Sequence, residues 1–492
     1  MTNQSKILFL ALISFAVLVL LINKANLLAG RSAIVQRAAQ PSLAPNPRDI
    51  LFYPLNLPGN GSNNTHLSGW NDLQKTTCDD PTCTSATTMI QEIPQIQGNP
   101  LTVDSPNMEI VTGIHKHGPY TGDPWVVYTM GIDQSNGTRT SAMFILSCTD
   151  KTCTQTPDVQ PIDLSYQSSD AIDQSGSAYA FPLHVFLSAV EDASGNLVIA
   201  DEYSVEIQNN PIYLYASSIH ISTVNPATHQ VLATNLVDNL RENPADYAHK
   251  AVTAIAIGTD GNPIVALNIN DTTQGGPSGA EIAHCNNPLC SSNTKHWLTP
   301  GLPYQAQFMD MKINPITGLA VIVFKPYYYS QINVASCADV ACTTATISTL
   351  AQSVVQGEAY YQGVSMQFNS YGNLVVATRN DAITSGIDRL QVITCVNTAC
   401  PNPHTSSIGN QATYEGSGVK MVLVNDIPHI AIKWGSPYPS VHAVQVYICA
   451  IGDPECLTPP SVYLHLNPLC DGGVSVYCGP DYTNAIGLVS TQ

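Results

Sequence analysis

The sequence predicts an all-β fold in which four-stranded antiparallel sheets repeat around a ring. Three observations point to it. A strand–turn–strand unit recurs along the chain, cysteine pairs recur inside that unit, and incomplete units at the two ends complement one another. One such sheet cannot bury both of its faces alone, but sheets packed against neighbours on either side can. Repeats of this length and content are typical of a β-propeller.

The repeated unit is clearest from Val364. VSMQFN alternates as a strand does, and SYGN is a turn whose Gly372 permits a positive φ. LVVATRN is a second strand that contains a continuous apolar run, as expected of a strand buried on both faces. LQVITC gives a third strand, the pair Cys395 and Cys400 follows, and a polar fourth strand runs from His404 to Ile408.

The same order of elements can be laid on five other segments. They begin at Val111, Val185, Val252, Gln307 and Val419. The unit from Val185 has no cysteines. Its third strand is expected to end near Ser222, so that Ser222 and Ala227 occupy the places of the pair. We interpret it as a degenerate unit.

An incomplete unit remains at each end of the chain. The segment from Trp70 has only a third and a fourth strand, and the segment from Gly472 could supply a first and a second. Together they predict a seventh blade built from both termini, which closes the ring. Six blades with flanking strands are the alternative.

The cysteines indicate an oxidising compartment. Five pairs share the C-x4-C spacing, a sixth has a longer loop, and two cysteines remain; the predicted disulfide cysteines are Cys78, Cys83, Cys148, Cys153, Cys285, Cys290, Cys337, Cys342, Cys395, Cys400, Cys449, Cys456, Cys470 and Cys478. Zinc sites usually need two cysteine knuckles that converge on one ion, whereas each pair here stands alone. Local disulfides fit better, and each would pin an outermost strand to the strand inside it.

The N-terminal residues predict export. Residues 1–30 contain an apolar run from Ile7 to Ile22, intermediate in length between a secretory signal and a membrane-spanning helix. A signal-anchor that holds the chain to a membrane and a cleaved signal peptide both remain open. Residues 31–50 are expected to form a proline-rich linker and residues 51–492 the propeller. Glycosylation sequons lie at Asn60, Asn63, Asn136 and Asn270.

Charge and motifs exclude several functions. The formal net charge is −18, which disfavours binding to a nucleic-acid backbone. The sequence has no nucleophile elbow, no H-E-x-x-H helix, no phosphate-binding loop and no dinucleotide fingerprint. No cofactor is predicted.

Few residues suggest catalysis. His115, His117, His184 and His249 lie near first strands but at different offsets, so a symmetric metal-binding ring is not predicted. Acidic residues follow or interrupt strands at Asp201, Glu202, Glu206 and Asp310. Asp310 could face the channel or bond to a neighbouring blade. A hydrolase or lyase with an axial site, metal-assisted or not, would draw on His115, His117, Asp201 or Asp310.

Aromatic residues suggest a binding surface instead. Tyr327, Tyr328 and Tyr329 follow a second strand, Tyr360 and Tyr361 precede the next first strand, and Trp434 lies in an equivalent place later in the chain. Aromatic side chains gathered at one face of a ring suit protein or sugar recognition.

The units resemble the repeats of secreted or surface β-propellers whose blades carry a paired-cysteine hairpin. The resemblance covers about Leu51 to the C-terminus and implies the fold alone, since such propellers include enzymes, lectins and adhesion scaffolds. We therefore expect a secreted or membrane-anchored module that binds protein or glycan through one face. The axial hydrolase or lyase is the alternative.

Overall fold

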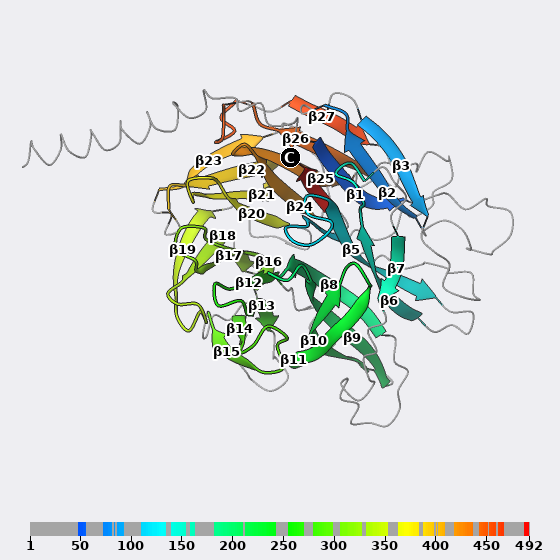
Figure 1. The fold of residues 1–492 in the computed structure, drawn as a ribbon. Helices are drawn as coiled ribbons and strands as arrows, with labels where there is room; N and C mark the ends of the chain where they lie inside the picture. Colours follow the sequence, from blue (N-terminus) through cyan, green and yellow to red (C-terminus); the bar gives the residue numbers. More distant parts are fainter. Residues whose placement is uncertain are drawn as a thin grey trace, which may run out of the picture. The chain divides into compact units, whose positions relative to one another are not determined.

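We analysed a computed structural model of the chain (Figure 1). The chain divides into two units, residues 1–46 and residues 47–492. All described residues belong to the second unit; they are 48–55, 72–80, 83, 86–92, 110–133, 139–153, 158–162, 182–209, 212–242, 254–269, 279–298, 306–326, 331–352, 363–382, 387–397, 400, 402–408, 418–435, 442–450, 452–458, 461–466 and 487–491.

The described residues form seven sheets of four antiparallel strands, arranged in a ring. The first three complete blades are β4 (Ile110–Ile114), β5 (Pro124–Asp133), β6 (Arg139–Ser147) and β7 (Asp158–Ile162); β8 (Pro182–Glu191), β9 (Leu197–Asn209), β10 (Ile212–Asn225) and β11 (Gln230–Glu242); and β12 (Ala254–Ile257), β13 (Pro263–Ile269), β14 (Gly279–Cys285) and β15 (Asn293–Trp297).

Three further complete blades follow. They are β16 (Ala306–Ile313), β17 (Ala320–Pro326), β18 (Gln331–Cys337) and β19 (Ala345–Gln352); β20 (Val364–Phe368), β21 (Leu374–Ala382), β22 (Ile387–Cys395) and β23 (His404–Ile408); and β24 (Val419–Val424), β25 (Ile427–Gly435), β26 (His442–Ile448) and β27 (Ser461–Leu466). The first strand of each blade is innermost, because it contacts the first strands of its neighbours.

The seventh blade closes the ring with strands from both ends, as predicted. It runs from β28 (Gly487–Thr491) through β1 (Arg48–Leu55) and β2 (Asp72–Cys78) to β3 (Ala86–Glu92). The expected division of two strands from each end is wrong, because the C-terminal segment gives one strand and the N-terminal segment gives three. The second strand, β1, begins directly after Pro47, inside the segment expected to be linker.

Hydrogen bonds from side chains join successive innermost strands. In three of the junctions a carboxylate or hydroxyl oxygen on one first strand accepts from a backbone N–H of the next. The bonds pair Ser188 Oγ with Ile255 N (3.2 Å), Asp310 Oδ2 with Met366 N (2.7 Å) and Ser365 Oγ with Met421 N (3.0 Å). An inner strand has one unpaired edge, so these side chains satisfy donors that would otherwise lack a protein partner.

Asp310 is expected to contribute measurably to stability. Its other oxygen accepts from Met311 N at 2.8 Å, so the carboxylate serves two backbone donors in two blades. Asp310→Ala should lower the free energy of unfolding by about 1–3 kcal/mol, because both donors lose their acceptor. Asp310→Asn keeps one acceptor oxygen and should lose less. Urea denaturation of the two variants tests this, and equal losses would contradict the acceptor role.

Six disulfides join cysteines within the described residues, and each second cysteine of these pairs lies in a left-handed backbone conformation. The pairs are Cys78–Cys83, Cys148–Cys153, Cys285–Cys290, Cys337–Cys342, Cys395–Cys400 and Cys449–Cys456. The φ angle at these second cysteines ranges from 42° at Cys400 to 57° at Cys290. Cys470 and Cys478 lie outside the described residues.

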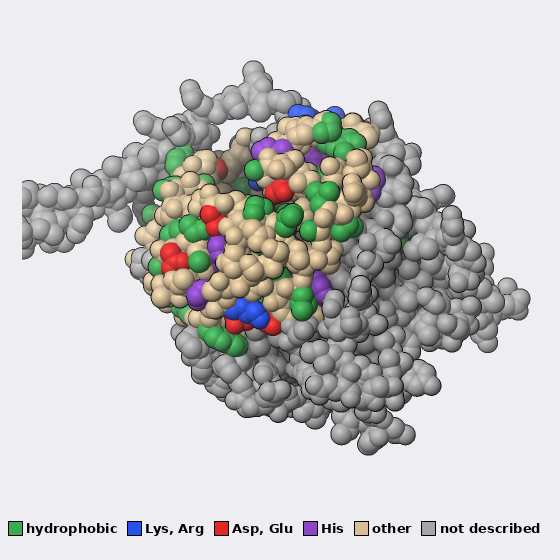
Figure 2. Space-filling view, turned by 60° about the horizontal axis from the view of Figure 1, so that its bottom comes forward, with side chains coloured by type: hydrophobic (Ala, Val, Ile, Leu, Met, Phe, Trp, Pro, Cys, Tyr) green, Lys and Arg blue, Asp and Glu red, His purple; other side chains and the backbone are tan. Residues whose placement is uncertain are grey.

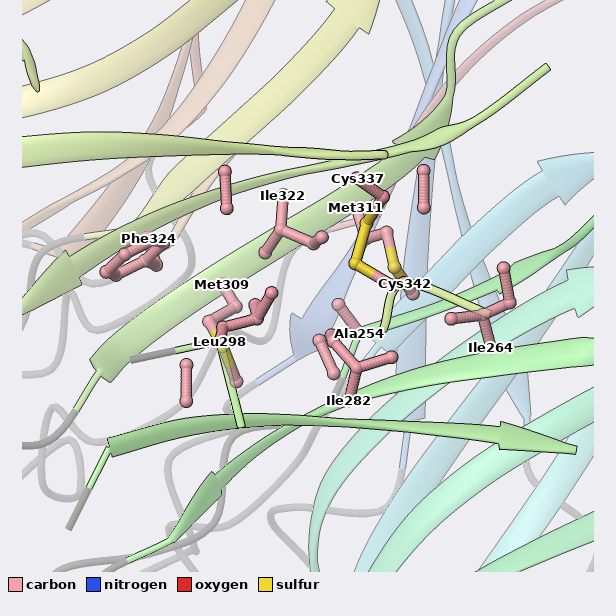
Figure 3. Close-up of a cluster of buried hydrophobic side chains, with 14 of the residues drawn as sticks. Ala254, Ile264, Ile282, Leu298, Met309, Met311, Ile322, Phe324, Cys337 and Cys342 are labelled. Carbon is pink, nitrogen blue, oxygen red and sulfur yellow. A yellow bond between two sulfur atoms is a disulfide. The ribbon is translucent and has the colours of Figure 1, made fainter. Parts of the chain in front are cut away.

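The disulfides are part of the packing between blades. Cys337 and Cys342 share a buried cluster with Ile264, Ile282 and Leu298 of the preceding blade (Figure 3). Four other disulfides are buried against their preceding blades in the same way: Cys78–Cys83, Cys285–Cys290, Cys395–Cys400 and Cys449–Cys456. The staple role expected from the sequence is therefore joined by a second role, as a packing surface between blades.

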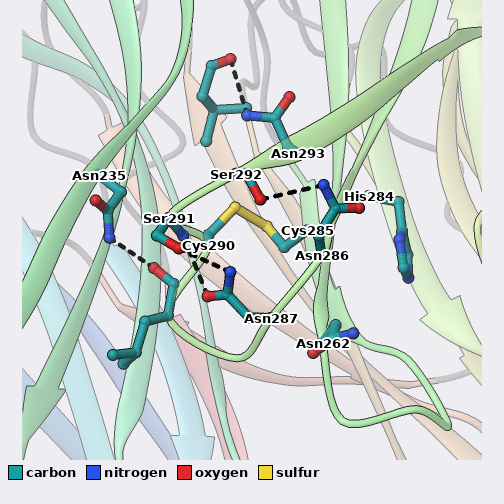
Figure 4. Close-up of a disulfide and its surroundings, with 12 residues drawn as sticks. Asn235, Asn262, His284, Cys285, Asn286, Asn287, Cys290, Ser291, Ser292 and Asn293 are labelled. Atoms are coloured by element: carbon teal, nitrogen blue, oxygen red, sulfur yellow. Dashed lines mark hydrogen bonds between the residues drawn. A yellow bond between two sulfur atoms is a disulfide. The ribbon is translucent and has the colours of Figure 1, made fainter.

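The cystine hairpins are also tied to the preceding blade by hydrogen bonds. In three of these hairpins, the backbone carbonyl of the residue before the second cysteine accepts a hydrogen bond from a side chain of the preceding blade. The donors and acceptors are Lys75 Nζ to Thr152 O (3.2 Å), Asn235 Nδ2 to Leu289 O (2.8 Å, Figure 4) and Ser406 Oγ to Glu455 O (2.6 Å). The closed loop fixes the direction of this carbonyl, so the disulfide shapes a contact between blades.

The blade without cysteines keeps the same backbone. In the β20–β23 blade, the first cysteine of the pair, Cys395, lies opposite Leu374, the residue that begins the second strand. In β9 and β10 the corresponding pair is Leu197 with Val224. Val224 is buried, and His229, five residues on, has φ 56°, as the second cysteines do. The positions of the missing pair are therefore Val224 and His229; the expected Ser222 and Ala227 are two residues too early.

The antiparallel order gives the ring two different faces. One face, which we call the turn face, carries the connections from first to second strands and the cystine hairpins. The other, the loop face, carries the connections from second to third strands and from each blade to the next. Most connections from first to second strands are short, such as residues 192–196, 258–262 and 369–373, whereas the connections from one blade to the next include residues 163–181, 243–253 and 353–363.

Candidate functional site: a polar junction between two blades

One junction between blades holds an unusual group of buried polar side chains. It lies between the β4–β7 blade and the β8–β11 blade, where β8–β11 has no disulfide. An apolar cluster joins the two blades there and includes Trp125, Leu187, Ile199 and Val224. We call the site the polar junction and define it by His115, Glu191, Asp201, Ser218 and His220.

Glu191 joins the two blades at the turn face. It is the last residue of β8, and its carboxylate accepts from two successive backbone N–H groups of the other blade. Lys116 N donates to Oε2 at 2.5 Å and His117 N donates to Oε1 at 3.0 Å. The Glu191 side chain is only 2% exposed. Successive N–H groups form a concave anion site, which explains how a carboxylate is tolerated in this interface.

His115 is buried beside Glu191. Its Nδ1 lies 3.8 Å from Glu191 Oε1, and its ring lies 5.7 Å from the ring of Tyr120. Nε2 is buried without a hydrogen-bond partner. Burial lowers the pKa of His115 from 6.5 to about 4, because the imidazolium would lose its hydration. His115 is therefore neutral at neutral pH.

Asp201 and His220 lie deeper in the same interface. They are directly opposite one another on β9 and β10, so their side chains share one sheet face. That face also carries Ile199, which packs against the β4–β7 blade. Ser218 Oγ lies 3.5 Å from His220 Nδ1, and all three polar side chains are buried. Serine, histidine and aspartate are the residue types of nucleophilic catalysis, but here the blades cover them.

The structure thus places two of the four axial candidates at the same junction, at different depths, and the other two elsewhere. His115 and Asp201 both lie in the polar junction, within the packing between blades. Asp310 bonds to the next blade, which settles the choice left open by the sequence. His117 is exposed on the turn face. Among the residues that the structure describes, no three histidine, cysteine, aspartate or glutamate side chains gather as a metal site would require.

Of the remaining acidic and histidine candidates, only Glu202 has a side chain among those described. Glu202 is buried and lies on the opposite sheet face from Asp201, toward the β12–β15 blade. Nothing is described of the side chains of Glu206 and His184, and His249 lies outside the described residues.

Another buried carboxylate, Glu281 on β14, could not be recognised from the sequence. It is 6% exposed and faces Asp238 of the preceding blade, whose carboxylate pairs with Lys295 Nζ at 2.6 Å. Burial, with a smaller contribution from Asp238, raises the pKa of Glu281 to about 7, and Lys295 opposes the rise. Only the packing of β11 against the next blade reveals this neighbourhood.

Several predicted positions lie outside the described residues. They are the sequons at Asn60, Asn63, Asn136 and Asn270, the tyrosines Tyr327, Tyr328, Tyr329, Tyr360 and Tyr361, and the N-terminal residues 1–47. The backbone of Trp434 is described, in β25. No helix within the described part of the chain is long and apolar enough to cross a membrane.

No family model and no curated protein matches this chain. Solved structures with a similar fold include an α-L-arabinanase from Penicillium chrysogenum complexed with arabinobiose (11% identity, TM-score 0.43, covering 71% of this chain and 95% of that one). An α-L-arabinofuranosidase from Fusarium graminearum has 11% identity and a TM-score of 0.38, covering 73% and 97%. A sialidase from Trypanosoma rangeli has 12% identity and a TM-score of 0.37, covering 69% of this chain and 53% of the sialidase. Likenesses this weak carry no information about activity.

Proposed function

We propose that the protein is an extracellular recognition module that binds a protein or glycan ligand through the loop face of the ring. The six disulfides support an oxidising compartment. A charge-poor surface supports recognition through neutral groups, and Figure 2 shows charged side chains of the described residues only in small, separate groups.

The difference between the two faces carries the proposal. Most connections from first to second strands, on the turn face, are short turns closed by internal hydrogen bonds, such as Gly372 N to Asn369 O at 2.9 Å. The connections from each blade to the next, on the loop face, are longer, and longer connections on a rigid scaffold are where binding residues concentrate. Their length and sequence are free to vary without disturbing the blades.

The aromatic residues fit the same face. Tyr327, Tyr328 and Tyr329 join β17 to β18, and Tyr360 and Tyr361 join β19 to β20. The flanking strand ends lie together, because Gln331 at the start of β18 pairs with Gln352 at the end of β19. Trp434 precedes the last residue of β25, at the same face of a nearby blade. Aromatic side chains supply large contact areas at little entropic cost, as recognition of protein or sugar requires.

Binding tests can separate the two ligand classes. The purified propeller should retain ligands on a glycan array or capture an extracellular protein. Replacing Tyr327, Tyr328 and Tyr329 together by alanine should weaken that binding at least about tenfold, because aromatic anchors dominate such interfaces. Tyr371→Ala, in the turn between β20 and β21 on the other face, is the matched control and should bind normally. Full binding by the triple variant would contradict the proposal.

The axial hydrolase or lyase finds less support. Of its four candidate residues, His115 and Asp201 are buried between blades, and Asp310 is engaged by two backbone donors. A catalytic group must reach the substrate, so buried side chains at a closed interface are poor candidates.

A further inference from the structure

We propose that the ring contains one acid-sensitive junction, at which the β4–β7 and β8–β11 blades separate when His115 becomes protonated. This inference does not depend on the proposed ligand-binding function. It rests on the different construction of this junction compared with the others.

The first observation is that the polar junction lacks a disulfide. In the other junctions, a cystine hairpin packs on the preceding blade or accepts hydrogen bonds from it. Here Val224 and His229 stand in place of the cysteines. The packing surface between the two blades is therefore formed by side chains that no covalent bond holds in position.

The second observation is that a buried histidine, His115, lies beside the Glu191 carboxylate that joins the two blades. Glu191 reaches across to two backbone N–H groups of the loop that also carries His115. His115 itself is 1% exposed, and its Nε2 has no hydrogen-bond acceptor. A proton added to Nε2 would place a charge in the buried interface and a donor that has no protein acceptor. Separation of the blades would let water hydrate the imidazolium.

Glu191 is the nearest carboxylate to that charge, but its Oε1 lies 3.8 Å from Nδ1, beyond hydrogen-bond distance. Nδ1 is the atom nearest Glu191, and the two Glu191 oxygens already accept from Lys116 N and His117 N. Asp192 accepts from Ser194 N and Asn196 N in its own turn. The other titratable or charged side chains described on these two blades are Lys116, His117, Tyr120, Asp123, Tyr128, Asp150, Lys151, Asp201, Glu202, His220, His229 and Asp238.

The direction of the effect follows from the two states of His115. In the closed junction its pKa is about 4, whereas a solvated histidine has a pKa of 6.5. At pH values between 4 and 6.5, His115 therefore binds a proton in the open form but not in the closed form. The closed form is favoured above pH 6.5 and loses ground as the pH falls toward 4. The ratio of open to closed junctions should rise on the order of 100-fold as the pH falls from 6.5 to 4.

Opening would have a local consequence. Asp201, Ser218 and His220 lie on the β8–β11 face that the β4–β7 blade covers. Separation would bring these buried groups into contact with solvent, whereas the cystine-packed junctions would remain closed.

Hydrogen exchange with mass-spectrometric readout tests the proposal on the whole chain. Exchange rates are measured at about pH 7 and about pH 4 and corrected for the intrinsic pH dependence of amide exchange. Peptides covering residues 110–117 and 186–202 should lose protection on acidification, while peptides covering β16 and β20 should not. His115→Gln should abolish the loss, and His117→Gln, an exposed histidine two residues away, should leave it unchanged.

Two results would overturn it. Equal loss of protection in all blades would show general acid destabilisation. An unchanged acid response in His115→Gln would show that another group is responsible. Should His115→Gln fail to fold, the comparison of junctions in the unmodified protein still decides, because the proposal requires the loss to be confined to one of them.

Discussion

Glu281→Gln should stabilise the protein by about 3 kcal/mol at pH 8 and have little effect at pH 4. The folded-state pKa of Glu281 is raised from 4.5 to about 7, first by burial and then by Asp238. Between these two values the folded protein holds a proton that the unfolded chain has released. Stability contributed by this site is therefore full below pH 4.5, falls as the pH rises to 7, and stays low above it. Glutamine is neutral throughout and avoids the loss.

Thermal and urea unfolding at several pH values measure this effect. Glu455→Gln on a cystine hairpin is the matched control, because the Glu455 side chain is about a third exposed, at 35%. Its pH profile should follow that of the unmodified protein. A gain in Glu281→Gln that is equal at acidic and alkaline pH would show that improved packing, rather than removal of a buried charge, is the cause.

A new disulfide should form in the double variant Val224→Cys, His229→Cys. His229 already has the left-handed backbone that the six second cysteines adopt, so the bridge requires no change of conformation. The loop closed is short, and the oxidised variant should be about 2 kcal/mol more stable than its reduced form. Unfolding with and without reductant, together with a free-thiol assay, measures the difference.

The control for this experiment is the pair that the sequence pattern suggested. Ser222→Cys with Ala227→Cys has the same spacing, but Ser222 pairs with Ile199 and with Thr234, inside the strands rather than at the turn. The thiols of that variant should remain free. Bridging in both variants would mean that the spacing alone, and not the backbone at His229, determines whether the bond forms.

The sequence was informative wherever a pattern repeats. Periodicity placed the four strands from Val364 to Ile408 close to their observed bounds, because alternation, turn glycines and cysteines all mark the same unit. It failed where a unit has lost its markers. Val224 carries no signal that it replaces a cysteine, and counting from the strand end placed the pair two residues early.

The site was less predictable than the fold. His115 and Asp201 were selected as single residues, and nothing in the sequence indicates that adjacent blades bury both. Glu281 lies among apolar residues of β14 and becomes unusual only beside Asp238, which is far from it in the chain. Such neighbourhoods depend on the order of blades around the ring, which a local pattern does not contain.

The strand β28 has a consequence for biosynthesis. It is made after every other strand, yet it is the innermost strand of a blade whose remaining strands are made first. Until it arrives, β1 has an unpaired edge and the buried faces of two neighbouring blades lack part of their cover. The growing chain must therefore keep its first three strands soluble while six blades are completed. The insertion of β28 also requires a glycine at position 487, since a Cβ there would meet Thr112 Cγ2 of the adjoining blade at 2.2 Å.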